Sequence, residues 1–358
     1  MSPWRHDPEA AADALIGKCL DAIDLGGGVL LANQAGALPA LLAARGVAFS
    51  LWNRRLAGSA QAQAWPPAGP FDLVLLRLPK AKDEQEMAAH AGLSVLAPGG
   101  RLIAWGGNDE GIRSAGRMIE RLCGEVATLA TRGHGRVLAG RRPSDGAGLR
   151  GSLAAWRSMV PLAIGGRMRP WVSYPGLFAA DRIDDGTALL IGALPPLRPG
   201  DRVLDYGCGS GVIGASALAQ VPTIALTLMD DDTAALEAAR ENVPGARLVL
   251  GTSLAGGGER AYAAILSNPP LHTGFAEDHA LLERLIADAP AHLQPGGCLQ
   301  IVVQRRLPLD RLLAKHFAAL TVPAETSRYR VWRAHLSPPS SFASCRRHAS
   351  GVMGRGSG

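Results

Sequence analysis

The sequence contains one pattern of apolar and small residues twice, about 170 to 200 positions apart, and this repeat restricts the possible folds more than any other feature. Residues 26–46 (GGGVLLANQAGALPALLAARG) and 200–220 (GDRVLDYGCGSGVIGASALAQ) both show an apolar strand, a turn of small residues and a helix of small residues. Residues 96–105 (LAPGGRLIAW) and 293–302 (LQPGGCLQIV) share a leucine, a Pro-Gly-Gly turn and a strand. Matching segments in the same order indicate a duplicated unit.

A third matching pair lies between these segments in each half. Residues 71–82 (FDLVLLRLPKAK) and 262–274 (YAAILSNPPLHTG) both show a buried strand followed by a loop that contains proline. Apolar strands that alternate with helical segments are typical of parallel sheets with helices on both faces. The predicted fold class is therefore α/β, with two tandem Rossmann-like domains built on mostly parallel, doubly wound sheets.

The length of 358 residues also favours two domains. The polar, glycine-rich and basic stretch at 139–152 predicts the boundary between them. We therefore expect one domain at 1–150 and a second at 151–336. Residues 337–358 have the composition of a disordered basic tail.

The composition of the chain limits its cellular location and the kinds of partner it can bind. The five cysteines form no CxxC pair and the acidic start is unlike a signal peptide, which together predict a reducing, cytoplasmic location. Glycine, glutamine and proline interrupt the long uncharged stretches, so we expect buried α/β elements and no membrane span. His272, His279 and His292 lack ligand spacing, and no metal site is predicted. The net charge of +6 permits a polyanionic partner without requiring one.

The clearest chemical motif of the second half is the glycine-rich turn VLDYGCGSG at 203–211. Gly207, Gly209 and Gly211 allow a tight turn and close approach of the backbone to a ligand. The stretch departs from the dinucleotide pattern GxGxxG. Asp205 at the end of the strand would repel a diphosphate, so the turn favours a cationic or amine-bearing ligand.

Two further polar positions follow the next strands. Asp230 ends the strand of ALTLMDDDTAALEAAREN, where a carboxylate can bind two ribose hydroxyls; a helix-capping acid is the alternative interpretation. Ser253 lies just past a third strand, where it could meet an adenine edge. Ser267, Asn268, Pro269 and Pro270 then follow a fourth strand. Ligands of open α/β sheets lie beyond the carboxyl ends of the strands, which places Asn268 beside the reactive end of a cofactor.

This ordered series resembles class I S-adenosylmethionine-dependent methyltransferases of the Asn-Pro-Pro type. The second half is most similar to the ribosomal RNA guanine-N2 methyltransferases of the small subunit, the C-type enzymes, and to their large-subunit relatives. Segments across Tyr174–Leu336 carry the resemblance: YPGLF, DDGTALL, VLDYGCGSGVIG, LTLMDDDTAALEAAR, LSNPPLHTG, LQPGGCLQIV and SRYRVWRA. LPKAK and NDEGIRSAG carry a fainter resemblance in the first half, and the family has a degenerate first domain.

The resemblance implies roles for specific residues. Asn268, Pro269 and Pro270 would be catalytic, with the Asn268 side-chain oxygen and the Pro269 carbonyl accepting both hydrogens of an exocyclic amine on rigid backbone. S-adenosylmethionine would be the cofactor. The implied cofactor-binding residues are Asp205, Gly207, Gly209, Gly211, Asp230, Ser253, Gly186 and Thr187. The implied substrate-binding residues are Leu271, Phe178, Arg328 and Arg330. Cross-strand packing is the alternative for the two arginines, which precede the last predicted strand, VWRAHL.

The chain departs from the family pattern in two ways that matter for the substrate. Leu271 stands where an aromatic residue usually stacks on the target base, and Ser253 stands where Asn or Asp is common. Guanine N2 of ribosomal RNA is the predicted acceptor. The alternatives are a DNA adenine amine, a protein glutamine amide, a small metabolite, or a non-catalytic role in RNA binding or ribosome assembly.

The first half lacks the acid and the close-set glycines of the second, so we expect no cofactor there. This domain would support the fold or position the substrate. Its basic residues could contact RNA phosphates or form ordinary solvated faces: Lys80, Lys82, Arg113, Arg117, Arg132, Arg136, Arg141 and Arg142.

Overall fold

The computed structural model describes residues 8–33, 36–56, 61–146, 148–179, 181–257, 261–269 and 275–336. These residues form two compact units. The first draws its described residues from Met1–Ser158, Ser173–Ala180 and Asp232–Ala234, and the second contains the others. The domain bounds 1–150 and 151–336 stay predictions, and the predicted tail lies outside the described residues.

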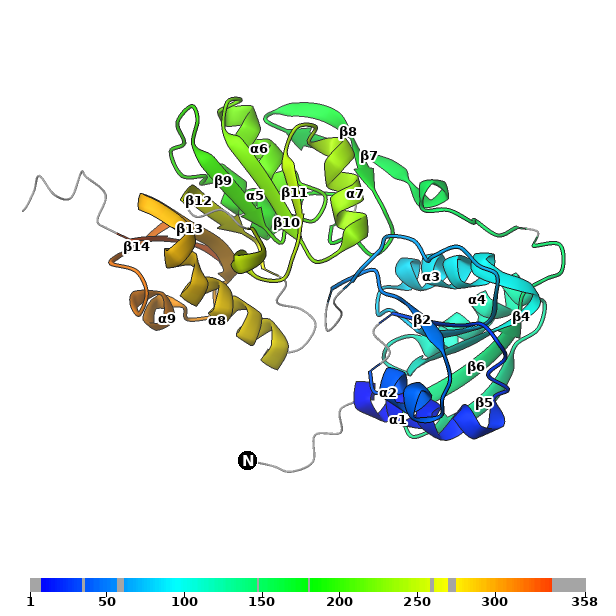
Figure 1. Cartoon of the computed structure of the whole chain (residues 1–358). Coiled ribbons are helices and arrows are strands. Elements are labelled where there is room, and N and C mark those ends of the chain that lie inside the picture. The colour runs from blue at the N-terminus through cyan, green and yellow to red at the C-terminus, as the bar shows by residue number, and fades with distance from the viewer. Residues whose placement is uncertain are drawn as a thin grey trace, which may run out of the picture. The chain divides into compact units, whose positions relative to one another are not determined.

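The first half of the chain builds a six-stranded sheet in the order β2-β1-β3-β4-β6-β5 (Figure 1). Strands β1 to β4 pair in parallel, whereas β6 is antiparallel to both β4 and β5. The elements are α1 (Pro8–Cys19), β1 (Val29–Ala32), α2 (Leu38–Ala44), β2 (Phe49–Trp52), β3 (Phe71–Arg77), α3 (Lys82–Val95), β4 (Leu96–Gly107), α4 (Ile112–Cys123), β5 (Ala127–Arg132) and β6 (Gly135–Arg141).

The second half builds a seven-stranded sheet in the order β11-β10-β9-β12-β13-β15-β14 and a two-stranded sheet of β7 and β8. Strand β15 is antiparallel to β13 and β14, as β6 is to its neighbours in the first half. The elements are β7 (Ser158–Ile164), β8 (Arg167–Ser173), α5 (Asp185–Gly192), β9 (Arg202–Tyr206), α6 (Val212–Gln220), β10 (Ala225–Asp230), α7 (Thr233–Asn242), β11 (Arg247–Leu250), β12 (Tyr262–Ser267), α8 (Phe275–His292), β13 (Leu293–Gln304), α9 (Asp310–Ala314), β14 (Ala319–Glu325) and β15 (Tyr329–His335).

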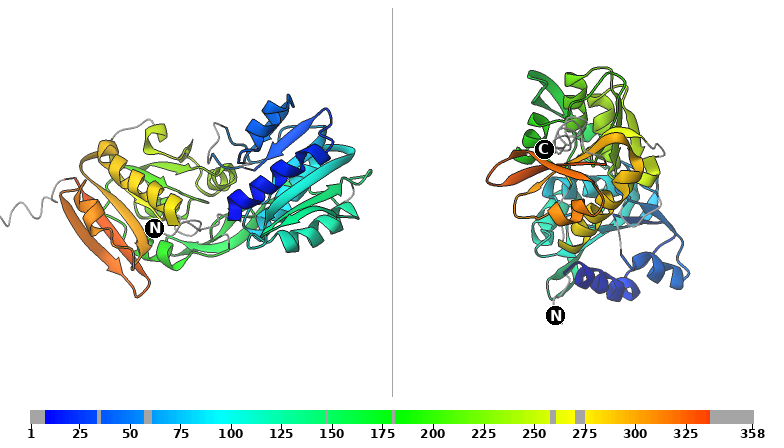
Figure 2. Two further views of the ribbon diagram at one scale, coloured as in Figure 1. Left: turned by 90° about the horizontal axis from the view of Figure 1, so that it is seen from below. Right: turned by 90° about the vertical axis from the view of Figure 1, so that its left-hand side faces the viewer.

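Both faces of the second sheet are covered by helices. Successive side chains of a strand point to opposite faces. Val203 accordingly packs with Ile213 of α6 in one core cluster, whereas Leu204 packs with Ile286 of α8 in another. Figure 2 shows α8, in yellow, lying against its sheet, and α8 contacts β13. Near-continuous apolar strands are therefore buried on both sides, as the sequence predicts. Among the described residues, none of the helices is both long and apolar enough to cross a membrane.

The first residue after the first parallel strand has the same backbone conformation and the same hydrogen bond in both halves. The amide of Asn33, after β1, donates to the carbonyl of Trp52 at 2.9 Å, and the amide of Gly207, after β9, donates to the carbonyl of Met229 at 2.9 Å. Both residues have positive φ, 64° for Asn33 and 69° for Gly207. Asparagine and glycine are the residues that tolerate this conformation best. The shared turn and strand order confirm the predicted fold class.

Candidate active site

Three polar segments meet at the carboxyl edge of the second sheet, around β9. Met229 of β10 is in register with Tyr206, and Leu266 of β12 is in register with Asp205. Asp230 and Asn268 therefore lie on opposite sides of the turn that begins at Gly207. The chain continues from β9 to β10 on one side and crosses to β12 on the other, which makes this edge a topological switch point, where ligands of open α/β sheets bind.

The three glycines of the turn have two different structural roles. Gly207, Gly209 and Gly211 all have positive φ, of 69°, 52° and 91°. A Cβ atom added to Gly207 or Gly209 would meet no atom within 4 Å, so the backbone is open to a ligand there. A Cβ on Gly211 would lie 2.9 Å from the Val243 side chain, so this glycine permits close packing of α6.

Side chains from distant parts of the sequence hold the turn in place. Oδ2 of Asp230 accepts a 2.7 Å hydrogen bond from the Gly209 amide. Trp171 Nε1 donates to the Ser210 hydroxyl at 2.9 Å, and Asn242 Nδ2 donates to the Ser210 carbonyl at 3.1 Å. Sequence analysis missed Trp171 and Asn242 because isolated residues on β8 and α7 form no motif with the turn.

Asp205 lies beneath the turn. Its side chain is 0% exposed, and its Oδ2 accepts a 2.9 Å hydrogen bond from the Gly214 amide in α6. Its Oδ1 has no hydrogen-bond partner among the described residues. Burial raises the pKa of this carboxyl from 3.8 to about 7, against the lowering effect of the Gly214 bond. In this structure Asp205 supports the turn and helix α6, and its contact with a cofactor stays a prediction.

Asn268 is anchored by the first turn of α5. Its Nδ2 donates to Thr187 Oγ1 at 2.9 Å and to Asp184 Oδ2 at 3.3 Å. Asp184 caps the helix by accepting from the Gly186 amide at 2.9 Å. Thus Gly186 and Thr187, predicted to bind cofactor, lie beside the predicted catalytic amide. Sequence analysis named both but missed Asp184, although Asp before a helix is a recognisable capping signal.

Of the remaining site candidates, the structure describes some and leaves others outside its described residues. Pro269 is buried next to Asn268, whereas Pro270 and Leu271 lie outside the described residues. Ser253 is half-buried beyond β11, in a loop that the Tyr206 hydroxyl contacts through a 2.8 Å hydrogen bond to the Thr252 carbonyl.

The described substrate-binding candidates each have a different local environment. Arg328 donates to exposed Asp185 of α5 at 3.0 Å, which brings it to the helix that holds Asn268. Arg330 forms a 2.6 Å ion pair with Glu325 across β14 and β15, the packing alternative foreseen for it. Strand β15 begins at Tyr329, so Arg330 lies within the last strand and does not precede it. Phe178 is 58% exposed and groups with the first unit.

The same edge of the first unit contains different chemistry. By register, Leu75 pairs with Leu31 as Leu266 pairs with Asp205, so Arg77 stands where the second half has Asn268. Arg77 is buried and forms ion pairs with Glu110 at 2.8 Å and Asp13 at 3.1 Å.

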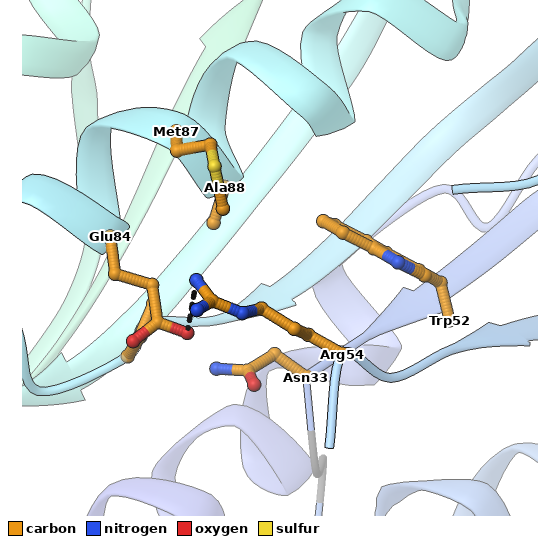
Figure 3. A pocket seen from close by; sticks show the side chains of 7 residues that line it. Asn33, Trp52, Arg54, Glu84, Met87 and Ala88 are labelled. Atoms are coloured by element: carbon orange, nitrogen blue, oxygen red, sulfur yellow. Dashed lines mark ion pairs between the residues drawn. The ribbon is translucent and has the colours of Figure 1, made fainter. Parts of the chain in front are cut away.

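A small pocket of this unit contains a further ion pair, between Arg54 and Glu84 at 3.4 Å (Figure 3). It is lined by Asn33, Trp52, Arg54, Pro79, Glu84, Met87 and Ala88. Across the described ranges of the chain, His, Cys, Asp and Glu side chains form no group of three that could hold a metal ion.

The sheet order and the site at its switch point are those of a methyltransferase. The methyltransferase small domain matches residues 170–333, and the N-terminal domain of the same family type matches residues 31–141. The ribosomal RNA small subunit methyltransferase C of Pseudomonas aeruginosa (strain LESB58) is 34% identical over 286 residues, which cover 79% of this chain and 85% of that protein. Its counterpart from Alteromonas mediterranea is 32% identical over 267 residues, which cover 74% of this chain and 73% of that protein.

A solved structure shares the two-domain fold. The T. thermophilus 16S rRNA N2 methyltransferase, solved in complex with AdoMet and guanosine, has a TM-score of 0.77 at 24% identity and covers 91% of this chain and 92% of that chain. The chain belongs to the ribosomal RNA small subunit methyltransferase C family. The family and the enzyme class predicted from the sequence are confirmed.

Proposed function

We propose that this chain transfers the methyl group of S-adenosylmethionine to the N2 amine of a guanine in small-subunit ribosomal RNA. The observation that carries the proposal is the anchoring of Asn268, whose Nδ2 faces Thr187 Oγ1 and Asp184 Oδ2 at 2.9 and 3.3 Å. Because the nitrogen end of the amide is engaged, the oxygen end faces the other way, as an acceptor for an amine.

The residues at this edge suit S-adenosylmethionine. Gly207 and Gly209 leave open space where a Cβ atom would stand, so a ligand can approach the backbone. Asp230 provides a carboxylate for ribose hydroxyls at the end of the neighbouring strand. Gly186 and Thr187 line the other side, next to Asn268. When bound, this cofactor supplies an electrophilic methyl group on a sulfonium cation.

In catalysis, the residues of this chain would bind and orient a weak nucleophile. The lone pair of an exocyclic base amine is conjugated with the ring, and such an amine is not deprotonated before it attacks near pH 7. One proton is lost to water afterwards, from the methylated and therefore acidic nitrogen. Asn268 Oδ1 and the Pro269 carbonyl can accept its two hydrogens and favour the geometry in which the lone pair leaves the ring plane. Pro269 restricts the backbone of Asn268, which keeps these acceptors preorganised. Good orientation of two reactants supplies up to about 7–11 kcal/mol of the barrier.

Ribosomal RNA as the substrate is supported by the relatives and by charge. The curated relatives are named as methyltransferases of the small ribosomal subunit RNA. The basic excess of the chain suits a polyanion, and six of the eight basic residues predicted to contact RNA are exposed: Lys80, Lys82, Arg113, Arg117, Arg132 and Arg141. Arg136 and Arg142 are half-buried, which leaves them less accessible to phosphates. A cytoplasmic location is consistent with a ribosomal substrate and with cysteines that form no CxxC pair.

The experiment is a radiolabel transfer assay with purified chain, labelled S-adenosylmethionine and four acceptors: small ribosomal subunits, free ribosomal RNA, DNA and a protein extract. Modified nucleotides are then mapped in the labelled RNA. We expect N2-methylguanosine in subunits or ribosomal RNA. We expect Asn268→Ala to bind S-adenosylmethionine as the wild type does, by calorimetry, and to lose at least about 100-fold in kcat, as for removal of an oriented polar group.

Other outcomes identify the alternatives. Label in DNA or in protein would show that the acceptor is not ribosomal RNA, while methyl transfer to an amine would still hold. Full methylation by Asn268→Ala would contradict the role of the amide. Absence of S-adenosylmethionine binding by the wild type would favour a non-catalytic RNA-binding or assembly factor.

A further inference from the structure

The first turn of α5 provides acceptors for both hydrogens of the Asn268 amide. Asp184 Oδ1 accepts from the Gly186 amide at 2.9 Å, which caps the helix. Asp184 Oδ2 accepts from Asn268 Nδ2 at 3.3 Å, and Thr187 Oγ1 accepts from the same nitrogen at 2.9 Å. Thr187 is 8% exposed, and Asp184 and Asn268 are both half-buried. One carboxylate thus caps the start of helix α5 and contacts the proposed catalytic side chain.

These contacts select one of the two orientations of the amide. An ionised carboxylate only accepts hydrogen bonds, whereas a hydroxyl both donates and accepts. Rotating the amide by half a turn would place its oxygen against Asp184 Oδ2, where two acceptors would face each other. Thr187 tolerates either end of the amide. Asp184 therefore sets the orientation, and Thr187 adds the shorter contact to it.

We propose that Asp184 and Thr187 are positioning residues that hold the Asn268 amide with its oxygen toward the acceptor amine. This inference rests on the proposed function, in which the Asn268 oxygen accepts a hydrogen bond from the acceptor amine. It assigns Asp184 a role in the reaction beyond helix capping. It also gives Thr187 a role through its hydroxyl, separate from any contact with cofactor.

Conservative substitutions separate orientation from capping. Asn caps helices about as well as Asp does, so Asp184→Asn keeps an oxygen for the Gly186 amide. The same change places an NH2 group opposite Asn268 Nδ2, or forces one of the two amides to turn. Thr187→Val removes the hydroxyl at nearly constant shape, and Thr187→Ser retains it. Asp201→Asn is a matched control, because Asp201 also accepts from a backbone amide, that of Arg198 at 2.7 Å, in the turn before β9.

The kinetic experiment measures kcat and KM on small ribosomal subunits, with calorimetric S-adenosylmethionine binding and thermal melting for each variant. We expect Asp184→Asn and Thr187→Val to lower kcat at least tenfold, which corresponds to about 1.4 kcal/mol. The melting temperature and KM should change little, because capping and RNA contacts are kept. Thr187→Ser should recover most of the kcat lost in Thr187→Val, and Asp201→Asn should have the kcat of the wild type.

A second measurement reports the amide itself and needs no turnover. The side-chain ¹⁵N–¹H₂ signals of Asn268 are identified by their loss in Asn268→Asp. We expect them to shift in Asp184→Asn and Thr187→Val and to stay in place in Asp201→Asn. The proposal is overturned if the wild type methylates RNA while both variants keep its kcat, or if kcat falls with the amide signals unmoved. A wild type that neither binds S-adenosylmethionine nor methylates would instead overturn the proposed function, and the amide signals would still test the orientation.

Discussion

The amide of Gly209 donates a 2.7 Å hydrogen bond to Oδ2 of Asp230. This contact joins the glycine turn after β9 to the end of β10. The turn proposed to lie under the cofactor and the acid proposed to hold its ribose are therefore one connected structure.

Removal of the Asp230 carboxylate tests this connection. Asp230→Ala deletes both the acceptor for the Gly209 amide and the proposed ribose ligand. We expect the Kd of S-adenosylmethionine to rise about 10-fold to 100-fold, as for loss of a hydrogen bond to a charged group. Calorimetric titration measures it, with Asp231→Ala as the control at the next carboxylate. Equal losses in both variants would show that net charge, and not this contact, governs binding.

Two glycines with a left-handed backbone, Gly209 and Gly200, separate an effect on stability from an effect on ligand binding. Gly209 and Gly200 have φ of 52° and 84°, and neither would place a Cβ atom within 4 Å of a neighbour. Alanine at either position should therefore destabilise the fold by about 1–2 kcal/mol. We expect only Gly209→Ala to weaken S-adenosylmethionine binding as well, because its methyl group would occupy the open side of the turn. The free energy of unfolding and the Kd of S-adenosylmethionine are measured for both variants. Equal Kd values for Gly209→Ala and Gly200→Ala would contradict the proposal that the cofactor lies against the turn at Gly209.

The buried Asp205 predicts a pH dependence of stability. Burial raises its pKa from 3.8 to about 7 in the folded chain, so the folded state holds a proton that the unfolded state releases between these values. The free energy of unfolding should therefore fall as pH rises from about 4 to about 7, by up to about 1.4 kcal/mol per pH unit, and this contribution should level off above pH 7.

The variant Asp205→Asn lacks this titration and keeps an oxygen for the Gly214 amide. We expect it to gain stability relative to the wild type between pH 5 and pH 7.5, as measured by calorimetry at both values. Asp201→Asn is the control for a carboxylate in a surface turn. A stability difference between Asp205→Asn and the wild type that is constant with pH would show that Asp205 is ionised in the folded chain.

The contact between Trp171 and Ser210 should help to hold the glycine turn. Trp171→Phe and Ser210→Ala each remove the 2.9 Å bond from the indole nitrogen to the hydroxyl. A double-mutant cycle on the free energy of unfolding should give a coupling of about 0.5–1.5 kcal/mol, the usual range for one hydrogen bond. Additive effects would mean that Trp171 acts through packing alone.

Much of the candidate site could be predicted because its members end parallel strands. Gly207, Asp230 and Asn268 each follow an apolar run, and the carboxyl ends of parallel strands share one edge of a sheet. Their convergence follows from the order of the strands, which the duplicated pattern already indicates. The fold class was predicted on the same grounds, whereas the family was predicted from the resemblance of the ordered motifs to those of known methyltransferases.

Residues that support the site could not be found in this way. Trp171 and Asn242 contact Ser210 from elements 39 and 32 residues away, and Asp184 contacts Asn268 across 84 residues. Such single contacts leave no periodic trace in a sequence. The ion pair of Arg330 with Glu325 likewise depends on the register of β14 and β15, and the substrate role of Arg330 stays a prediction.

The sequence by itself determined the repeated α/β unit and the polar residues at the strand ends, because both follow from local apolar patterning and turn chemistry. Only the tertiary structure decided that Asp205 lies beneath the turn and that the Asn268 amide nitrogen contacts Thr187 and Asp184. Burial and hydrogen-bond direction are set by several elements packing around one side chain, and that arrangement exists only once the chain has folded.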